Sequence, residues 1–527
     1  MNLTAAGRAR MTLAAVIVAQ ALLIIDITIV TVGLPQVQRD LGGSLAGVQW
    51  IVAAYALTLA ACTQTAGTLS DRLGRRLIYV LGITVFTVAS VLCGLAPSVA
   101  FLDVARGLQG VGAAMVMANS LPLIATAYEG QKRNMAIAIF GTVLQVAGAI
   151  APVLGGLLVT LDWRWMFLIN VPIGVVAFVI ALGFMPAYRP DSARSGRIDW
   201  SGAALLMLSL GLLNFALIRG EDQGWGSAAT LLQLAGGVVL LTVFLAVEKR
   251  VTAPIIDLSL FRIPTFTAIN VIAFVSRLIT IGGAVYFIFY FQAALGMSPM
   301  ESGLLLVPVF VAQIAGGIGV AKLQARITAS QIIVAGYVVK GLSAVWMAQT
   351  FESGAGAWSL VLPMAFWGLG GGVAGVPILS TSMNVVAKDK AGMASGTIMS
   401  MFMIGAGVGS AGLGVVFKER IGEVVIADSA LPEGSRQAVA DAAAQVDLER
   451  LKAATPPGFE VVVQQTMEKA ISSGTSLVTL TTAALSVISV VVAVFFIRER
   501  DIVAAKAKNA TAGTARESAT DDRGGAG

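Results

Sequence analysis

The chain has 527 residues, of which 57% are hydrophobic and only 12% are charged. A soluble globular protein carries about 25% charged residues, so this composition, with a mean hydropathy of +0.85, excludes that class and indicates a polytopic membrane protein. The net charge of +6 does not indicate nucleic-acid binding, because the basic residues lie between the apolar segments.

Fourteen apolar segments are long enough to cross about 30 Å of hydrocarbon as helices. An even number of spans places both termini on the same side of the membrane. The segments lie near residues 11–35, 47–69, 77–96, 101–121, 135–159, 165–187, 200–218, 228–247, 264–295, 302–321, 331–350, 357–383, 392–417 and 475–497.

The charges between the spans predict the orientation. If the N-terminus is inside, the inner segments hold 17 basic residues and the short outer loops hold three, Arg39, Arg164 and Arg219. The positive-inside rule therefore places both termini in the cytoplasm. The inner set is Arg8, Arg10, Arg72, Arg75, Arg76, Lys132, Arg133, Arg189, Arg194, Arg197, Lys249, Arg250, Arg262, Lys322, Arg326, Lys388 and Lys390.

The first span contains a carboxylate, Asp26. A charged side chain at the bilayer centre costs on the order of 3 kcal/mol even on lenient insertion scales, so such groups usually face a cavity, pair with a cation or carry a proton. The chain has no histidine. A buried carboxylate is therefore the natural proton carrier if protons are moved.

The loop between the second and third spans combines glycines with charges: Gly67, Asp71, Arg72, Gly74 and Arg75. The glycines suit a tight turn, and the charges suit pairing with neighbouring helix ends.

The fourth span holds Asp103 and Arg106. Arg106 needs an anionic partner at this depth. Both Arg106 and Asp26 are expected in the outer halves of their spans, so Asp26 is the first candidate. Asp103, one helical turn away, is the second candidate, or else a solvated residue at the mouth.

The fifth span contains Pro152, Gly155 and Gly156. A proline in mid-span bends a helix, and small residues allow a neighbouring helix to approach closely.

These motifs resemble those of the major facilitator superfamily. Gly67–Arg76 is similar to its G-x-L-a-D-r-x-G-r-k/r loop, which implies a gating cluster. Arg106–Gly112 resembles its R-x-x-q-G-x-g motif, and Gly148–Gly156 resembles, with Ala151 in place of a glycine, the G-x-x-x-G-P-x-x-G-G motif of exporters. Asp26–Pro35 and Trp163–Gly174 resemble segments of the fourteen-span drug:proton antiporters, as does Tyr290–Gly303. Phe402 stands where many of those relatives carry arginine.

Other polar residues inside the spans are candidates for the wall of a cavity. Besides Asp103 they are Gln145, Arg277, Tyr286 and Gln292. Lys340 is a further intramembrane cation and is expected to snorkel or to lie at a helix interface. The G-x-G-x-x-G sequences at 370–375 and 407–412 lie in apolar spans, so they predict helix packing and no dinucleotide site.

The resemblance implies an all-α fold of two six-helix bundles with two inserted helices. The N-terminal bundle would occupy 1–187, the insert with its flanking loops 188–263 and the C-terminal bundle 264–497, including a long extracellular loop at 418–474. Residues 498–527 read as a disordered cytoplasmic tail. An amphipathic helix is expected at 435–454, and the insert is expected to flank the transport path.

The expected function is proton-coupled export of amphipathic, cationic drugs or antibiotics across the plasma membrane. This function is transport and does not include an enzymatic reaction. The protein is expected to be a monomer that binds protons and small molecules, without a cofactor, a metal or a nucleic-acid partner. Asp26 would bind the proton and Arg106 would tune its affinity. A dedicated exporter of one natural product stays open, and so does a solute importer or a transport-inactive sensor.

Overall fold

The computed structural model describes residues 4–42, 44–128, 130–185, 199–251, 258–323, 326–352, 356–386, 391–444 and 448–503. These residues are almost entirely helical and include no strand. The first half has α1 Ala5–Leu41, α2 Leu45–Leu73, α3 Arg75–Gly94, α4 Val99–Ala127, α5 Gly130–Leu161, α6 Trp165–Leu168, α7 Asn170–Phe184, α8 Trp200–Gln223 and α9 Ala228–Glu248. The second half has α10 Pro264–Arg277, α11 Gly283–Phe289, α12 Pro299–Leu323, α13 Ala329–Glu352, α14 Val361–Asn384, α15 Ala391–Ala427, α16 Glu433–Ala444, α17 Leu448–Ala454 and α18 Glu460–Phe496.

Within these described ranges, twelve helices are long and apolar enough to cross a membrane. The two other predicted spans fall in α2 and α5, where the described residues cover the apolar stretches Gly47–Thr63 and Val146–Leu161. The all-α polytopic architecture is therefore confirmed, while the count of fourteen spans stays a prediction.

The segment predicted as one span at 264–295 is interrupted twice. Between α10 and α11 lies a π-helical turn, η3 (Leu278–Gly282), and a second, η4 (Tyr290–Ala294), follows α11. A π-turn adds one residue to the helical repeat and often marks a functional position. Here it changes the direction in which the following side chains point, while the helix continues.

Part of the connection predicted at 418–474 is helical. Helix α15 continues to Ala427 and α18 begins at Glu460, because a helix need not end where its hydropathy falls. The amphipathic helix expected at 435–454 coincides with α16 and α17, and 445–447, between them, lie outside the described residues. Asp428 accepts hydrogen bonds from the Ala430 amide and the Thr466 hydroxyl, which lowers the pKa of its carboxyl and ties the connection to α18.

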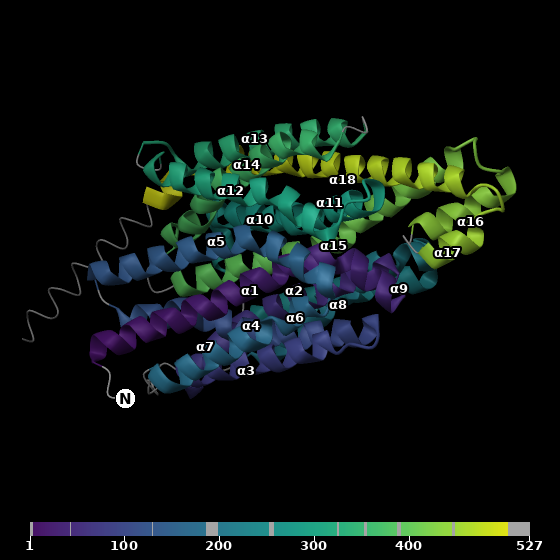
Figure 1. Ribbon diagram of the computed structural model, residues 1–527. Coiled ribbons are helices and arrows are strands. Elements are labelled where there is room, and N and C mark those ends of the chain that lie inside the picture. The colour runs from purple at the N-terminus through teal and green to yellow at the C-terminus, as the bar shows by residue number, and fades with distance from the viewer. Residues whose placement is uncertain are drawn as a thin grey trace, which may run out of the picture.

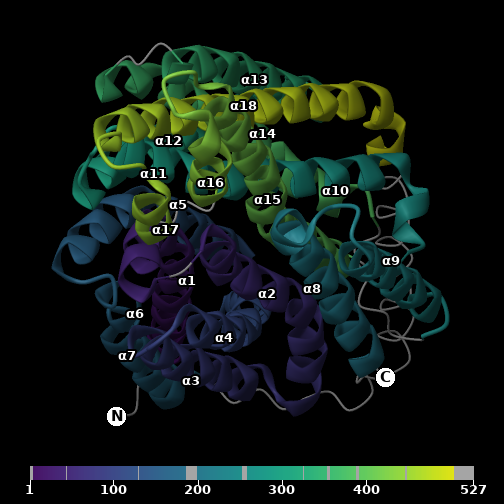
Figure 2. The ribbon, with the colours of Figure 1, turned by 90° about the vertical axis from the view of Figure 1, so that its right-hand side faces the viewer.

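Two groups of helices lie side by side (Figure 1). Helices α1 to α7 form one group, and α10 to α15 with α18 form the other, while α16 and α17 lie at the end opposite the N-terminus (Figure 1, Figure 2). The start of the predicted tail is described: Arg498 and Asp501 hydrogen-bond to Thr265 at the beginning of α10. The rest of that tail, 504–527, lies outside the described residues.

Helices α8 and α9 pack beside the junction of the two groups (Figure 2). Leu206 and Leu210 of α8 share a buried cluster with Leu57 of α2 and Ile404 of α15. The pair therefore covers the line along which α2 and α15 meet.

The two groups touch through small residues. A Cβ added at Gly156 of α5 would stand 2.5 Å from the Cα of Met300 in α12, and one at Gly303 would meet the carbonyl of Pro152. On the other side, the Ser400 hydroxyl of α15 donates to the Ala60 carbonyl of α2 at 3.4 Å. The expected close helix approach at the proline–glycine motif of α5 is thus present, at the contact between the groups.

Candidate functional site

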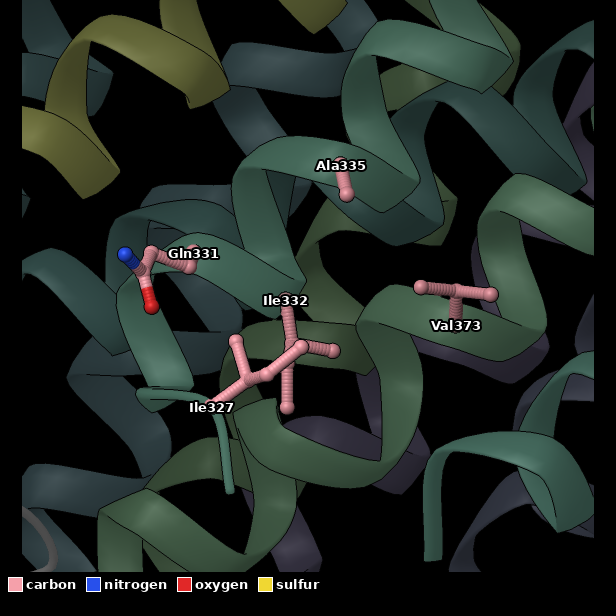
Figure 3. Close-up of a pocket in the computed structure, with 5 residues that line it drawn as sticks. All are labelled: Ile327, Gln331, Ile332, Ala335 and Val373. Atoms are coloured by element: carbon pink, nitrogen blue, oxygen red, sulfur yellow. The ribbon is translucent and has the colours of Figure 1, made fainter. Parts of the chain in front are cut away.

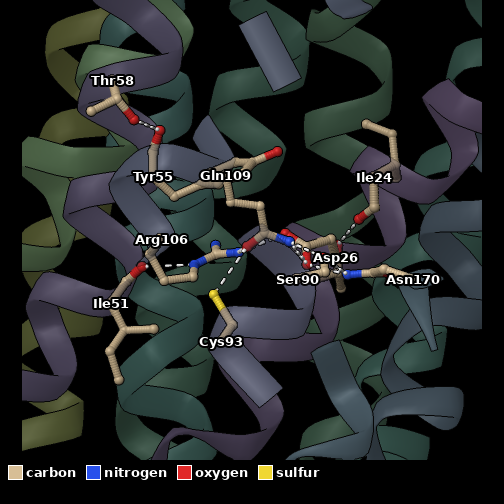
Figure 4. A network of polar contacts seen from close by, with 11 residues as sticks. Ile24, Asp26, Ile51, Tyr55, Thr58, Ser90, Cys93, Arg106, Gln109 and Asn170 are labelled. Carbon is tan, nitrogen blue, oxygen red and sulfur yellow. Dashed lines mark hydrogen bonds and ion pairs between the residues drawn. The ribbon is translucent and has the colours of Figure 1, made fainter. Parts of the chain in front are cut away.

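Asp26 lies at the centre of a closed polar network (Figure 4). Its side chain is 0% exposed. One carboxylate oxygen, Oδ2, is 2.7 Å from Nη1 of Arg106, and the other, Oδ1, accepts from Gln109 Nε2 at 3.0 Å and from Asn170 Nδ2 at 2.7 Å. The ionised carboxylate therefore has three donors, two of them neutral amides.

The guanidinium of Arg106 is held on several sides. Nη1 also donates to Gln109 Oε1 at 2.7 Å, and Nε donates to the Ile51 carbonyl at 3.1 Å. The ring of Tyr55 lies 4.2 Å from the Arg106 Cζ, close enough for a cation–π contact. Arg106 is only 1% exposed, so the structure brings the first candidate partner of Arg106, Asp26, into a fully buried ion pair.

The helices that carry these groups are held together by local features of the sequence. Arg106 and Gln109 are three residues apart on α4 and so share one face. Gly112 of α4 packs against the backbone of Phe86 in α3, where a Cβ would be 2.5 Å away. This close approach places Ser90 of α3 within 2.6 Å of Gln109 Nε2.

Three members of the network were not predicted from the sequence. The motifs that contain Gln109 and Asn170 assign no contact to either residue, and none of the motifs contains Ser90. The available signal was a polar residue inside an apolar span, since such residues usually face the bundle interior. Asp103, the second candidate partner of Arg106, does not join the network: its Oδ1 is buried and has no hydrogen-bond partner in the described structure.

The predicted gating loop is a single residue long. Helix α2 ends at Leu73 and α3 begins at Arg75, and Gly74 between them has a φ of 103°, which favours glycine. Nothing crowds Gly67, whose added Cβ would meet no atom within 4 Å. The side chains of Asp71 and Arg72 lie outside the described residues, so their part in gating stays a prediction.

Tyr286 and Gln292 make contacts across the two helix groups. Tyr286 Oη accepts from Gln49 Nε2 of α2 at 3.1 Å and donates to the Ser410 carbonyl at 2.5 Å. Gln292 donates to the Val32 carbonyl of α1 at 2.9 Å. Both side chains are buried, so in this conformation they hold the groups together and do not line an open cavity. The Gln145 side chain lies outside the described residues.

The two intramembrane cations of the second half contact aromatic rings. The Arg277 guanidinium lies 5.0 Å from the centre of the Phe402 ring, and Lys340 Nζ lies 4.3 Å from the Trp367 ring. Lys340 also donates to the Thr280 hydroxyl at 2.8 Å and is 2% exposed. It therefore lies at a helix interface, one of the two positions expected for it.

One pocket lies away from all of these groups, between α13 and α14 (Figure 3). Its volume is about 410 Å³, and its walls are Ile327, Gln331, Ile332, Ala335 and Val373. No charged side chain lines it. It offers apolar surface and no chemistry that would hold a proton or an ionic group.

Comparisons with known proteins indicate the family of the chain. Residues 16–410 match the family described as the Major Facilitator Superfamily. The "Tetracenomycin C resistance and export protein" of Streptomyces glaucescens is 34% identical over 497 residues, which are 93% of this chain and 92% of that protein. The "Multidrug resistance protein Stp" of Mycobacterium tuberculosis is 33% identical over 402 residues, 75% of this chain and 73% of that protein.

Solved structures show the same fold at low sequence identity. A bacterial homologue of the human lysosomal transporter Spinster, inward-facing and unoccupied, has a TM-score of 0.64 at 15% identity, covering 94% of this chain and 98% of that one. A D-xylose–proton symporter has a TM-score of 0.61 at 12% identity, covering 93% and 98%. On the family match and the near-full-length relative, the chain belongs to the major facilitator superfamily, and these relatives are named for antibiotic and multidrug resistance.

Proposed function

We propose that this protein is a proton-coupled exporter of amphipathic small molecules, with both termini in the cytoplasm and the spans in the plasma membrane. The proton carrier is Asp26. The observation that carries the proposal is a buried carboxylate whose charge is compensated by one cation, Arg106, and by two neutral amides. A monomer suffices for this mechanism, because every member of the network belongs to one bundle.

The network allows two states of different charge. When Asp26 is ionised, Arg106 binds it and the site is neutral overall. When Asp26 takes up a proton, the ion pair loses its attraction and Arg106 is left with the carbonyls of Ile51 and Gln109. A change of this kind at a bundle interior biases the arrangement of α1 against α4, and a substrate drives the cycle if it binds the two states differently.

Export from the cytoplasm then needs a path between the bundles near the middle of the membrane, where substrate sites of such transporters lie. The proline–glycine contact of α5 with α12 and the bonds of Tyr286 and Gln292 join the bundles in the half nearer α16 and α17. We propose that these contacts open when substrate leaves, and that the loop at Gly74 closes the cytoplasmic side.

The experiment uses inverted membrane vesicles with an acidified interior. Addition of transported compounds from a panel releases protons, and Asp26→Asn abolishes that release. Asp40→Asn is the matched control, since Asp40 is an exposed carboxylate at the far end of the same helix. Proton release equal to wild type in the Asp26→Asn vesicles would place the proton carrier elsewhere, and Asp103 would be the next residue to change.

A second candidate is the dedicated export of one natural product. The observation in its favour is the Streptomyces glaucescens relative, named for a single compound and matched over 92% of its length. A broad compound panel separates the two: proton release by many unrelated compounds supports drug export, and release by one structural class supports a dedicated exporter. Uptake in the opposite direction, or no flux at all, would favour an importer or a sensor.

The charge of the substrate is a separate point. The sequence and its family resemblance predict a cationic compound. In the structure Asp26 is already bound to Arg106, so a cation reaches an ionised Asp26 only if Arg106 leaves. The proposal is therefore made here for amphipathic compounds of any charge.

A further inference from the structure

Two basic side chains lie inside the second bundle without an acidic partner. Arg277 ends α10, and Lys340 lies in the middle of α13. Neither belongs to any ion pair among the residues that the structure describes.

The sequence explains why a partner is missing. No Asp or Glu occurs at 258–300, 302–351, 353–388, 390–418 or 469–498. Among the described residues, the acidic side chains that flank these stretches lie toward helix ends: Glu301 at the first turn of α12, Glu352 at the last turn of α13, Glu419 toward the end of α15, Glu468 toward the start of α18 and Glu499 beyond α18. The interior of this bundle therefore has no carboxylate of its own, in contrast to the first bundle with Asp26.

The aromatic rings offset only part of the free-energy cost of burying the two charges. A cation–π contact contributes up to about 2 kcal/mol when it is desolvated, whereas an unpaired buried ion costs several kcal/mol. An ammonium has three donors, and the structure gives Lys340 one oxygen acceptor, Thr280, together with the Trp367 ring. Arg277 has the Phe402 ring. Both cations therefore retain N–H donors that can bind an anion.

The position of Arg277 is beside the junction of the two bundles. It rests on Phe402 of α15, and Phe274, one helical turn before it on α10, packs against the cluster that Leu57 of α2 and Ile404 of α15 form at the junction. Arg277 is partly exposed. Thr280, the acceptor for Lys340, lies in η3, three residues beyond Arg277. The charges of Arg277 and Lys340 are close enough to act on each other, so the two cations are neighbours, with Lys340 the more deeply buried.

We propose that Arg277 and Lys340 form the binding site for the acidic group of an aromatic organic acid, a carboxylate or an ionised phenol attached to a ring system. The anion supplies the missing counter-charge, and Trp367 and Phe402, the rings beside the two cations, supply apolar surface against which the ring system packs. This inference names the substrate class of the transport proposed above and rests on that proposal. A cationic compound would instead meet two like charges, with Asp26 already occupied.

The test is a binding measurement, which does not depend on proton coupling. Purified full-length protein in lipid nanodiscs is dialysed against three matched probes: a naphthalene carboxylate, its methyl ester and the corresponding naphthylmethylamine. We expect the acid to bind at least about tenfold more tightly than the ester or the amine. An ester or amine that binds as tightly as the acid overturns the proposal without any variant.

Two variants then assign the site. Arg277→Gln and Lys340→Met should each weaken binding of the acid by about tenfold and change binding of the ester by less than about twofold. Arg277→Lys, which keeps the charge, should retain most of the affinity. Arg164→Gln is the control, since it removes one partly exposed positive charge near the outer end of α5. Acid binding unchanged in both variants overturns the assignment.

The vesicle experiment distinguishes the failure of this inference from the failure of the proposed transport. Proton release on addition of the amine, with none on addition of the acid, keeps proton-coupled export and overturns the acid site. Tight acid binding without proton release by any compound keeps the acid site and overturns the coupling. If one variant does not elute as folded protein, the other variant and the wild-type probe comparison still decide.

Discussion

Asn170, the first residue of α7, donates a hydrogen bond of 2.7 Å from Nδ2 to the Oδ1 of Asp26 in α1. Its Nδ2 also lies 3.1 Å from the Ser90 hydroxyl of α3. One amide thereby connects three helices at the centre of the first bundle, and it fixes the direction in which Asp26 points. Hydrogen bonds to charged groups contribute about 1.5–3 kcal/mol each to the free energy of unfolding, so the Asn170 side chain contributes more than packing.

Asn170→Ala should lower the free energy of unfolding by about 2 kcal/mol and impair transport, because Asp26 loses one of its neutral donors. The measurement is the thermal unfolding midpoint of purified protein, together with drug-induced proton release. The control is Asn214→Ala, since Asn214 is equally buried but donates only to Leu210 of its own helix. An equal loss in the two variants would show that the Asn170 contact has no special role.

The ion pair of Asp26 with Arg106 predicts a specific pattern of stability. Removal of one partner from a buried pair costs about 3–5 kcal/mol, because the other charge stays buried. Asp26→Asn and Arg106→Gln should therefore each reduce the yield of folded protein, and the double variant should recover most of it without recovering transport. The yield is measured by size-exclusion chromatography in detergent. Recovery of transport in the double variant would reduce the pair to a structural role.

The crossing of α5 and α12 predicts the effect of one methyl group. Gly156→Ala would place a Cβ 2.5 Å from the Cα of Met300 and 2.6 Å from the Pro299 carbonyl, which are backbone atoms and cannot move cheaply. Efflux should fall by about tenfold, which corresponds to destabilising the arrangement in which α5 and α12 touch by about 1.4 kcal/mol. Gly183→Ala is the control, because no atom lies within 4 Å of its added Cβ. Wild-type efflux by Gly156→Ala would mean that this contact does not form during transport.

The proposed orientation is tested by labelling single cysteines. In a variant without Cys62 and Cys93, a cysteine at Gln437 on the exposed face of α16 should react with a membrane-impermeant maleimide in intact cells. A cysteine at Thr4 should react only after the membrane is permeabilised. The reverse result would overturn the orientation and, with it, the direction of export.

Much of the architecture follows from sequence because each span must satisfy its own backbone in lipid, which leaves helices as the solution. The pairing of Asp26 with Arg106 could also be predicted from the sequence, since both charges need a partner at a similar depth in the membrane. The contacts of Asn170 and Ser90 were not, because a neutral polar residue in a span signals a contact without naming its partner. The π-turns at 278–282 and 290–294 could not be predicted either, because an apolar sequence has the same hydropathy pattern with or without them.

The placement of α8 affects the free energy of transport itself. Leu206 and Leu210 contact α2 and α15 at once, so a rocking motion of the bundles must open one of these contacts. In water the newly exposed apolar surface would cost about 25 cal/mol per Å². In the bilayer, lipid tails replace the lost partner and no such penalty arises. A helix that would lock two domains together in a soluble protein can therefore slide along their junction here at little free-energy cost.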